Sequence, residues 1–291
     1  MTQTTPAPAV TMTSAAAAAG RGSVVRAYRW EIIKLVHQWR TRAVLGACLI
    51  GPFLFVIALD QQDRVPKDTL YGRFVHTSGF ALALMLLGFC AQWAFPLLTA
   101  LVAGDIFAAE DGHGTWKTIL TRSHGRTHIF TAKVLAAMTF ALAVLLALAA
   151  ATLGAGVLLV GDQPLESVTG TPIAPGHAAL LVAAAWGTAA LPLLGFTALA
   201  VMMSVLTRSA ALGIVTPVVI GLLMQLFTFL NGTDTVRHLL LVTPFDSWHG
   251  LLATHPFYGP LLHGSWVSVG YIVICLAVAF QVLRRRDITG G

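Results

Sequence analysis

Charged residues are scarce in this chain of 291 residues, of which Asp, Glu, Lys and Arg make up only 10%. A soluble domain typically carries about 25%. Hydrophobic residues make up 56%, and the mean hydropathy is +0.78. This number of charged side chains is too small to cover a water-facing surface. The composition therefore excludes an ordinary soluble domain and predicts a protein embedded largely in lipid. The net charge of +6 does not indicate nucleic-acid binding, because the basic residues cluster at the ends of apolar runs.

Cysteine is also scarce, with only Cys48, Cys90 and Cys275, each inside a separate apolar run. An odd number of buried cysteines excludes a disulfide framework, and the absence of C-x-x-C excludes the common zinc motifs. We interpret all three as small apolar packing residues. Residues 1–23 lack the basic start and apolar core of a signal peptide, and their Ala, Thr and Pro composition predicts a disordered cytoplasmic tail.

The centres of the apolar runs contain essentially no ionisable residue, which argues against an ion-coupled pump. Lys133, near the start of one run, is expected to extend its ammonium group toward the membrane surface. His249, His255 and His263 fit neither a helical i,i+4 pair nor a zinc signature, so no metal site is predicted. No Ser or Cys nucleophile accompanies a histidine, so the chain is expected to have no catalytic or cofactor-binding residues.

Apolar stretches of about 20 residues are long enough to cross a hydrocarbon core of about 30 Å. The sequence contains six of them, and we expect an all-α integral membrane fold. The predicted spans are residues 43–59, 79–103, 129–160, 178–206, 210–230 and 265–283. Pro52, Pro96, Pro192 and Pro217 lie inside spans, where kinks are expected.

The distribution of Lys and Arg predicts the orientation of these spans. If the N-terminus is cytoplasmic, fourteen of the 18 basic residues lie on the cytoplasmic side. They are Arg21, Arg26, Arg29, Lys34, Arg40, Arg42, Lys117, Arg122, Arg126, Lys133, Arg208, Arg284, Arg285 and Arg286. The other four are Arg64, Lys67, Arg73 and Arg237. This bias predicts a multi-pass protein of the cell membrane with both termini, including the tail 287–291, in the cytoplasm.

Residues 24–42 precede the first span and have an amphipathic pattern. Five apolar residues share one face of a helix, while most basic residues lie off it. The apolar face consists of Val25, Tyr28, Ile32, Leu35 and Trp39. Aromatic and basic residues together are typical of a helix in the headgroup layer, so we expect an interfacial helix here.

The segment 104–127 between the second and third spans is compact, polar and rich in Gly and His. It does not match a Walker A loop, because Trp116 rather than Gly precedes Lys117 and no strand comes before it. Gly112 and Gly114 permit a sharp backbone reversal. A short helix is expected over 115–121, in a rigid loop fixed at both ends to helices that cross the bilayer.

At these residues the sequence resembles a known family. The residues Glu110, Gly114, Thr115, Leu120, Thr121, Ser123, Arg126 and Lys133 resemble the cytoplasmic loop of ABC-2-type permeases, the membrane subunits of ATP-driven ABC transporters. Members typically read E-x-x-x-G-T, then a short helix ending in T-x-P/S, then R and later K. Ser123-His124 stands where many members have proline, which leaves the helix end less defined.

Other segments are similar to the same family, and the resemblance extends from about Val24 to Arg286. Tyr28–Arg42 resembles the N-terminal elbow helix, and Ser204–Leu223 resembles the cytoplasmic turn between the fourth and fifth spans. Leu241–Trp248 resembles the outer segment before the sixth span, within the stretch 231–264 where we expect re-entrant helices on the external side.

The resemblance implies a permease domain over 24–286 that pairs with a second permease copy and with a separate ABC ATP-binding subunit. The loop 104–127 would act as a coupling helix, and ATP and Mg would bind only to the partner subunit. The residues assigned to this coupling are Glu110, Gly114, Thr115, Trp116, Lys117, Leu120, Arg122 and Arg126. Lipid is the other expected partner, and the expected activity is export of an amphipathic or hydrophobic small molecule or peptide.

Gln92, Thr99 and Gln225 are the most polar candidates for a translocation path, although hydrogen bonding between helices is the favoured role for them. Three alternative functions stay open. The first is an ion- or proton-coupled secondary transporter or channel without an ATPase partner. This alternative predicts internal repeats and charged residues within the membrane. The second is a membrane enzyme that works through its histidines, and the third is a structural subunit.

Overall fold

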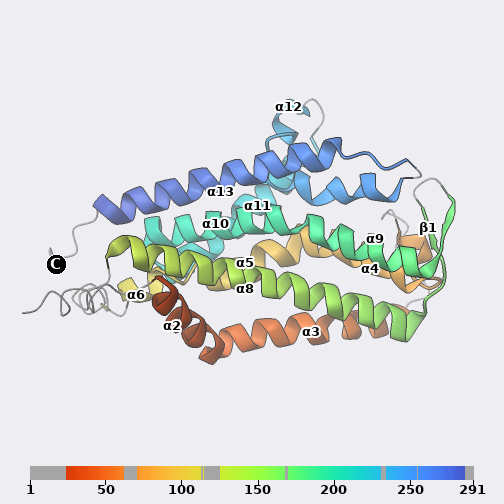
Figure 1. The fold of residues 1–291 in the computed structure, drawn as a ribbon, viewed down its shortest axis with the longest axis horizontal. Helices are drawn as coiled ribbons and strands as arrows, with labels where there is room; N and C mark the ends of the chain where they lie inside the picture. Colours follow the sequence, from red (N-terminus) through yellow and green to blue (C-terminus); the bar gives the residue numbers. More distant parts are fainter. Residues whose placement is uncertain are drawn as a thin grey trace, which may run out of the picture.

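The computed structural model describes residues 24–61, 71–112, 114, 125–167, 170–230, 234–253 and 255–285, and these form a long helical bundle (Figure 1). Six stretches are long and apolar enough to cross a membrane. They are Trp39–Asp60, Gly79–Gly112, Arg126–Val160, Pro175–Thr207, Ala210–Thr228 and Gly259–Arg285. Each of the six predicted spans lies on one of them, although the last helix begins at Gly259 rather than at 265. The prediction of a mostly helical protein with six such segments is confirmed.

The chain enters the bundle through two helices that meet at an angle (Figure 1). Helix α2 (Val24–His37) ends where Gln38 adopts an extended backbone, with ψ of 129°, and α3 (Trp39–Asp60) begins at the next residue. The predicted helix 24–42 was therefore too long, and residues 39–42 belong to the first apolar helix. Composition could not locate this break, because it depends on a single backbone torsion.

Helix α2 packs against the bundle with only part of the apolar face expected from its sequence. Leu35 is buried, and Tyr28 and Ile32 pack beside it, with the Tyr28 hydroxyl 2.9 Å from Thr139 Oγ1. Val25 and Trp39, placed on the same face by the sequence pattern, are exposed instead. The buried face lies on α8 (Arg126–Ala155).

Proline explains two of the helix interruptions. The second apolar segment consists of α4 (Gly79–Phe89), a π-helical turn at Cys90–Ala94, α5 (Phe95–Ala103) and α6 (Ala108–Gly112). The π-helical turn precedes Pro96, and α9 (Pro175–Thr188) ends four residues before Pro192, within α10 (Ala190–Thr207). A proline nitrogen cannot donate to the carbonyl four residues earlier, which favours these interruptions. Pro52 and Pro217 lie inside helices that continue past them.

Helix α10 lies at the centre of the bundle, where it packs against α13 (Gly259–Arg285), α11 (Ala210–Thr228), α5 and α8. Trp186 on α9 and Phe196 on α10 are almost completely buried. Helices α3, α11 and α13 lie at the periphery and expose many of their large apolar side chains. Such surfaces suit contact with lipid chains rather than water.

The end of the bundle on the right of Figure 1 contains two short strands. After a π-helical turn at Gly156–Val160, β1 (Leu165–Glu166) pairs antiparallel with β2 (Pro172–Ile173). These two-residue strands are the one departure from all-α structure in the described part of the chain. A short 3-10 helix, η1 (Gly72–Phe74), precedes α4.

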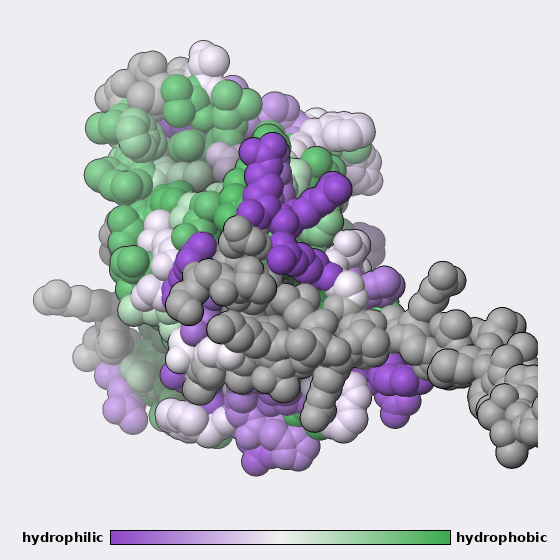
Figure 2. All heavy atoms as spheres, turned by 90° about the vertical axis from the view of Figure 1, so that its left-hand side faces the viewer, coloured by the Kyte–Doolittle hydropathy of each residue, from purple (hydrophilic) through white to green (hydrophobic). Residues whose placement is uncertain are grey.

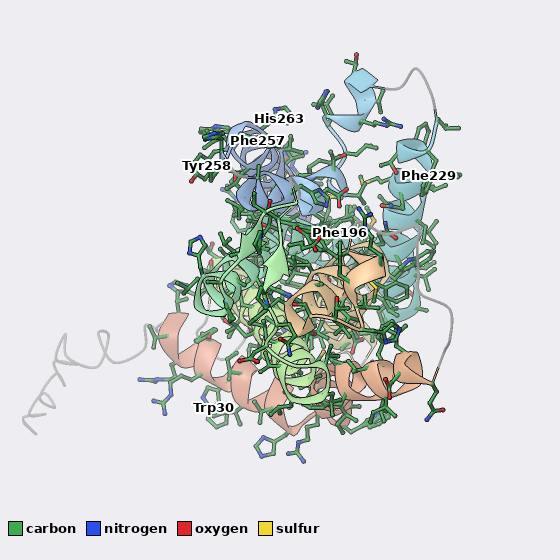
Figure 3. All side chains as sticks on the ribbon, turned by 90° about the vertical axis from the view of Figure 1, so that its right-hand side faces the viewer. Trp30, Phe196, Phe229, Phe257, Tyr258 and His263 are labelled. Atoms are coloured by element: carbon green, nitrogen blue, oxygen red, sulfur yellow. The ribbon has the colours of Figure 1, made fainter. Side chains whose placement is uncertain are left out.

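The predicted external region 231–264 contains α12 (Asp234–Arg237), the 3-10 helix η4 (Thr243–Leu252) and the first turns of α13. Phe245 and Trp248 of η4 are buried, and the Phe245 ring stacks on Phe95 with centroids 5.7 Å apart. Trp248 therefore belongs to the core. Phe257 and Tyr258 are exposed, as Figure 3 shows at the edge of this end.

Candidate functional site: an ion-pair cluster beneath the loop 104–127

The described part of the loop 104–127 begins with a turn and helix α6, which are held against α10 and α11. The Ser204 hydroxyl on α10 accepts hydrogen bonds from the backbone N–H groups of Phe107 and Ala108, at 3.2 and 3.0 Å. Gly104 packs against the backbone of Gly213 on α11 so closely that an added Cβ would lie 2.3 Å from the Gly213 carbonyl oxygen. The start of the loop is therefore fixed firmly to α10 and α11.

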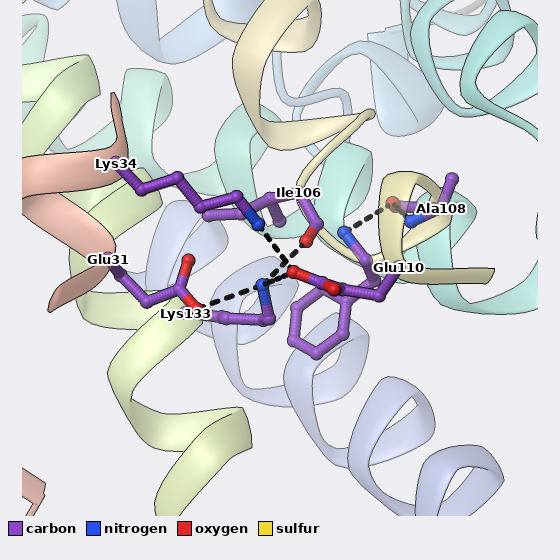
Figure 4. Close-up of polar contacts among 8 residues, drawn as sticks. Glu31, Lys34, Ile106, Ala108, Glu110 and Lys133 are labelled. Carbon is purple, nitrogen blue, oxygen red and sulfur yellow. Dashed lines mark hydrogen bonds and ion pairs between the residues drawn. The ribbon is translucent and has the colours of Figure 1, made fainter. Parts of the chain in front are cut away.

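Helix α6 directs Glu110 into the protein, where it meets two lysines (Figure 4). Lys133 Nζ, on α8, donates to Glu110 Oε1 at 3.1 Å and to the Ile106 carbonyl oxygen at 3.1 Å. It also forms an ion pair with Glu31 Oε1 on α2 at 3.1 Å. Lys34, on α2, donates to the same oxygen of Glu110. We call Glu31, Lys34, Glu110 and Lys133 the ion-pair cluster.

Lys133 was expected to extend toward the membrane surface, and that expectation was wrong. Its side chain is 0% exposed, and its ammonium group turns inward to two carboxylates, a carbonyl oxygen and the Phe107 ring, whose centroid is 5.9 Å away. A buried charge is tolerated when it is paired and hydrogen-bonded, and here all of its partners lie within reach.

The cluster contains two positive and two negative side chains, so its formal charge is balanced. Burial by itself would lower the pKa of Lys34, but its hydrogen bond to Glu110 and the charges of Glu110, Glu31 and Asp105 outweigh burial and raise that pKa. Lys34 therefore stays a cation at neutral pH. Because the partners come from α2, α6 and α8, the cluster joins the start of the loop to α2 and α8.

Further contacts strengthen this end of the bundle. Arg40 Nη1 donates to Asp105 Oδ2 at 3.0 Å, which joins the start of α3 to the turn before α6. Arg126, predicted to act in coupling, begins α8, and its Nη1 donates to the Arg284 carbonyl oxygen at 2.8 Å. Arg126 thereby fixes the end of α13 to the end of the loop.

The structure places the other predicted coupling residues as follows. Gly114 has φ of +63°, a left-handed conformation that fits the predicted backbone reversal, whereas Gly112 belongs to helix α6. The helix predicted over 115–121 lies outside the described residues. Thr115, Trp116, Lys117, Leu120 and Arg122 lie outside them as well.

The three candidates for a translocation path do not form a common polar surface. The Thr99 hydroxyl is buried and donates to the Phe95 carbonyl oxygen of its own helix at 2.7 Å. Gln92 is exposed on the π-helical turn, and Gln225 is half-buried on α11. Within the described ranges, no group of three or more His, Cys, Asp or Glu side chains could hold a metal ion.

Sequence reasoning missed Glu31 and Ser204 and gave Lys133 the wrong environment. One signal was present, because a single lysine in a long apolar run needs a carboxylate partner and Glu31 is the only acidic residue in α2. Ser204 gave no signal, because its role depends on α10 lying beside the turn before α6.

Comparison with known proteins adds one relationship. No curated protein matches this chain. A family whose description is "Protein of unknown function (DUF2705)" matches residues 47–289, which include five of the six apolar segments in full and most of the first. The match covers well over half of the chain, which therefore belongs to the DUF2705 family.

Proposed function

We propose that the chain is the membrane subunit of an ABC-2-type exporter and that the loop 104–127 receives mechanical work from a separate ATP-binding subunit. The observation that carries this proposal is the ion-pair cluster, because Glu110 at the start of the loop contacts α2 and α8 at once. A loop that only connected two spans would not need a buried carboxylate held by two lysines. The family-like residues Glu110 and Gly114 support the same function.

The distribution of charge supports a cytoplasmic position for the loop. Described basic residues gather on α2, where α3 and α8 begin and where α13 ends, and Figure 2 shows hydrophilic side chains on this end. They are Arg26, Arg29, Lys34, Arg40, Arg42, Arg126, Arg284 and Arg285. In a cell membrane such an end faces the cytoplasm. The N- and C-termini are proposed to lie there as well.

Helix α2 is proposed to be the elbow helix of the permease. It buries Tyr28, Ile32 and Leu35 against the bundle and exposes Trp30 and Ile33 elsewhere on its surface. A helix that packs one apolar face against protein and exposes further apolar side chains is typical of the boundary between a helical bundle and the lipid headgroups. Lys34 on this helix then joins the elbow to Glu110.

In the proposed mechanism, closure of the ATP-binding subunits displaces the loop. Ser204 and the Gly104–Gly213 contact resist movement of α6 away from α10 and α11, while Glu110 transmits the displacement to α2 and α8. ATP binding can shift the bundle only if the ATP-binding subunit contacts its two states differently. Two copies of the permease are proposed to rock between inward- and outward-facing states in this way.

The proposal is tested by affinity purification of the tagged chain from its native membranes, followed by mass spectrometry and ATPase assay. We expect a co-purifying subunit with a Walker A motif, and ATP hydrolysis that substrate stimulates. Glu110→Gln should lower the stimulated rate at least tenfold while the complex stays assembled. Asp111→Asn, next to it on α6, is the matched control. Transport that continues after ATP depletion and follows an ion gradient would instead favour a secondary transporter.

A further inference from the structure

A cavity of about 530 Å³ lies between η4 and the first turns of α13. His263, one of its lining residues, lies at the edge of the bundle in the end view of Figure 3. Ligand pockets typically enclose about 300–1,000 Å³, so this cavity is large enough for a small organic molecule. Pro244 and Pro260 contribute to a surface that is mostly apolar.

The polar groups in this cavity are arranged as hydrogen-bond acceptors. Thr243 Oγ1 donates to the Arg237 carbonyl oxygen at 2.6 Å, and Ser247 Oγ donates to the Pro244 carbonyl oxygen at 2.6 Å. Both hydroxyl hydrogens are therefore used inside the protein, and the lone pairs of the two oxygens stay available. A ligand in contact with these hydroxyls would have to supply the hydrogen.

His263 also offers a hydrogen-bond acceptor to the cavity. Its Nε2 lies 2.9 Å from the His238 carbonyl oxygen, and a carbonyl can only accept, so Nε2 carries the hydrogen. The Nδ1 atom of the neutral ring is then an acceptor. The two imidazole rings meet edge to face with centroids 5.6 Å apart, which adds aromatic surface beside the acceptors.

Asp246 supplies the formal charge among the residues that line the cavity. Its side chain is exposed at the opening, but the surrounding protein raises the pKa of this carboxyl group, an effect that the neighbouring His249 partly opposes. Burial also lowers the pKa of His249. A cation in the cavity would stabilise ionised Asp246. The nearest arginine in sequence, Arg237, donates instead to the Thr228 and Leu230 carbonyl oxygens at the end of α11.

We propose that this cavity binds an amphipathic amine, with its ammonium group on Asp246 and its apolar body against Pro244 and Pro260. An ammonium group supplies a positive charge for the Asp246 carboxylate and N–H donors for the acceptor atoms of Thr243, Ser247 and His263. Binding requires neither ATP nor a second subunit, so the inference does not rest on the proposed function.

The test uses three probes that share one apolar cage: 1-aminoadamantane, 1-adamantanol and 1-adamantanecarboxylate. Each is titrated into the full purified chain in phosphatidylcholine nanodiscs, whose lipids have no net charge, and binding is followed by isothermal titration calorimetry. We expect saturable binding of the amine, at least tenfold weaker binding of the alcohol and no binding of the carboxylate. Equal affinity for all three probes, preference for the carboxylate, or no saturable binding of the amine would overturn the inference.

Asp246→Asn keeps the size of the side chain and removes its charge. We expect it to weaken amine binding at least tenfold, to the level of the alcohol. Asp162→Asn, at an exposed acidic residue outside the cavity, should leave amine affinity unchanged. Unchanged affinity in Asp246→Asn would refute the proposed contact. If that variant does not fold, the order of the three probes on the unmodified chain still decides the question.

Discussion

Replacing Lys133 by methionine tests the ion-pair cluster most sharply. Methionine keeps most of the length of the side chain but removes the ammonium group that contacts Glu31, Glu110 and the Ile106 carbonyl oxygen. Two carboxylates would then share Lys34 as the remaining cation of the cluster. We therefore expect a large loss in the free energy of unfolding, because a buried charge left without its partner is costly.

The magnitude follows from burial. The Lys133 side chain is 0% exposed and that of Glu110 is 6% exposed, so removing Lys133 should cost about 3–5 kcal/mol. The Lys34 side chain is 45% exposed, and solvent screening reduces its contribution to about 0–1 kcal/mol. Lys34→Met is thus a matched control on the same carboxylate.

The assay is equilibrium unfolding in detergent micelles with increasing SDS, followed by tryptophan fluorescence. In addition to the two single variants, Glu110→Leu is combined with Lys133→Met. Removing both buried charges should recover at least half of the stability lost in Lys133→Met alone, because no unpaired buried carboxylate stays on α6. Equal destabilisation by Lys133→Met and Lys34→Met, or no recovery in the double variant, would refute the reasoning.

Three further predictions concern other contacts, and the same unfolding assay measures the first two. Ser204→Ala leaves two buried N–H groups without their acceptor and should cost about 1–3 kcal/mol. The Ser265 hydroxyl donates to the Leu261 carbonyl oxygen of its own helix, so Ser265→Ala should change the free energy of unfolding by less than about 0.5 kcal/mol. A loss in Ser265→Ala as large as that in Ser204→Ala would contradict the role of Ser204. Gly104→Ala should force α5 and α11 apart and destabilise the chain, whereas Gly46→Ala meets open space and should not. Finally, 1-aminoadamantane should bind more weakly as the pH falls, because protonation removes the Asp246 charge and gives positive charge to the neighbouring His249. The decline should begin above the ordinary carboxyl pKa of 3.8, because that of Asp246 is raised, and titration calorimetry at several pH values checks it.

The six apolar segments could be predicted because length and hydropathy determine them locally. A run such as 129–160 contains enough apolar residues to cross a bilayer whatever its neighbours are. The π-helical turn lies just before Pro96, where a kink was expected. The break at Gln38 depends on the backbone torsions of that residue, so composition alone could not place it.

The candidate site was predictable only in part. Glu110 and Gly114 were identified through the resemblance to the cytoplasmic loop of ABC-2-type permeases, and Gly114 does adopt a left-handed conformation. The partners of Glu110 could not be identified, because Lys34 and Lys133 are 76 and 23 residues away in sequence and meet it only once α2 and α8 pack together.

The side of the membrane on which the loop lies is the central claim, and cysteine labelling at position 117 tests it directly. The native cysteines Cys48, Cys90 and Cys275 are buried and should react little, so Lys117→Cys can be studied in the otherwise unchanged chain. Asp162→Cys, exposed at the opposite end of the bundle, serves as the external control. With a membrane-impermeant maleimide, we expect Lys117→Cys to react in inverted vesicles and not in intact cells, and Asp162→Cys to show the reverse. Reaction of Lys117→Cys in intact cells would place the loop outside and contradict its proposed coupling to an ATP-binding subunit.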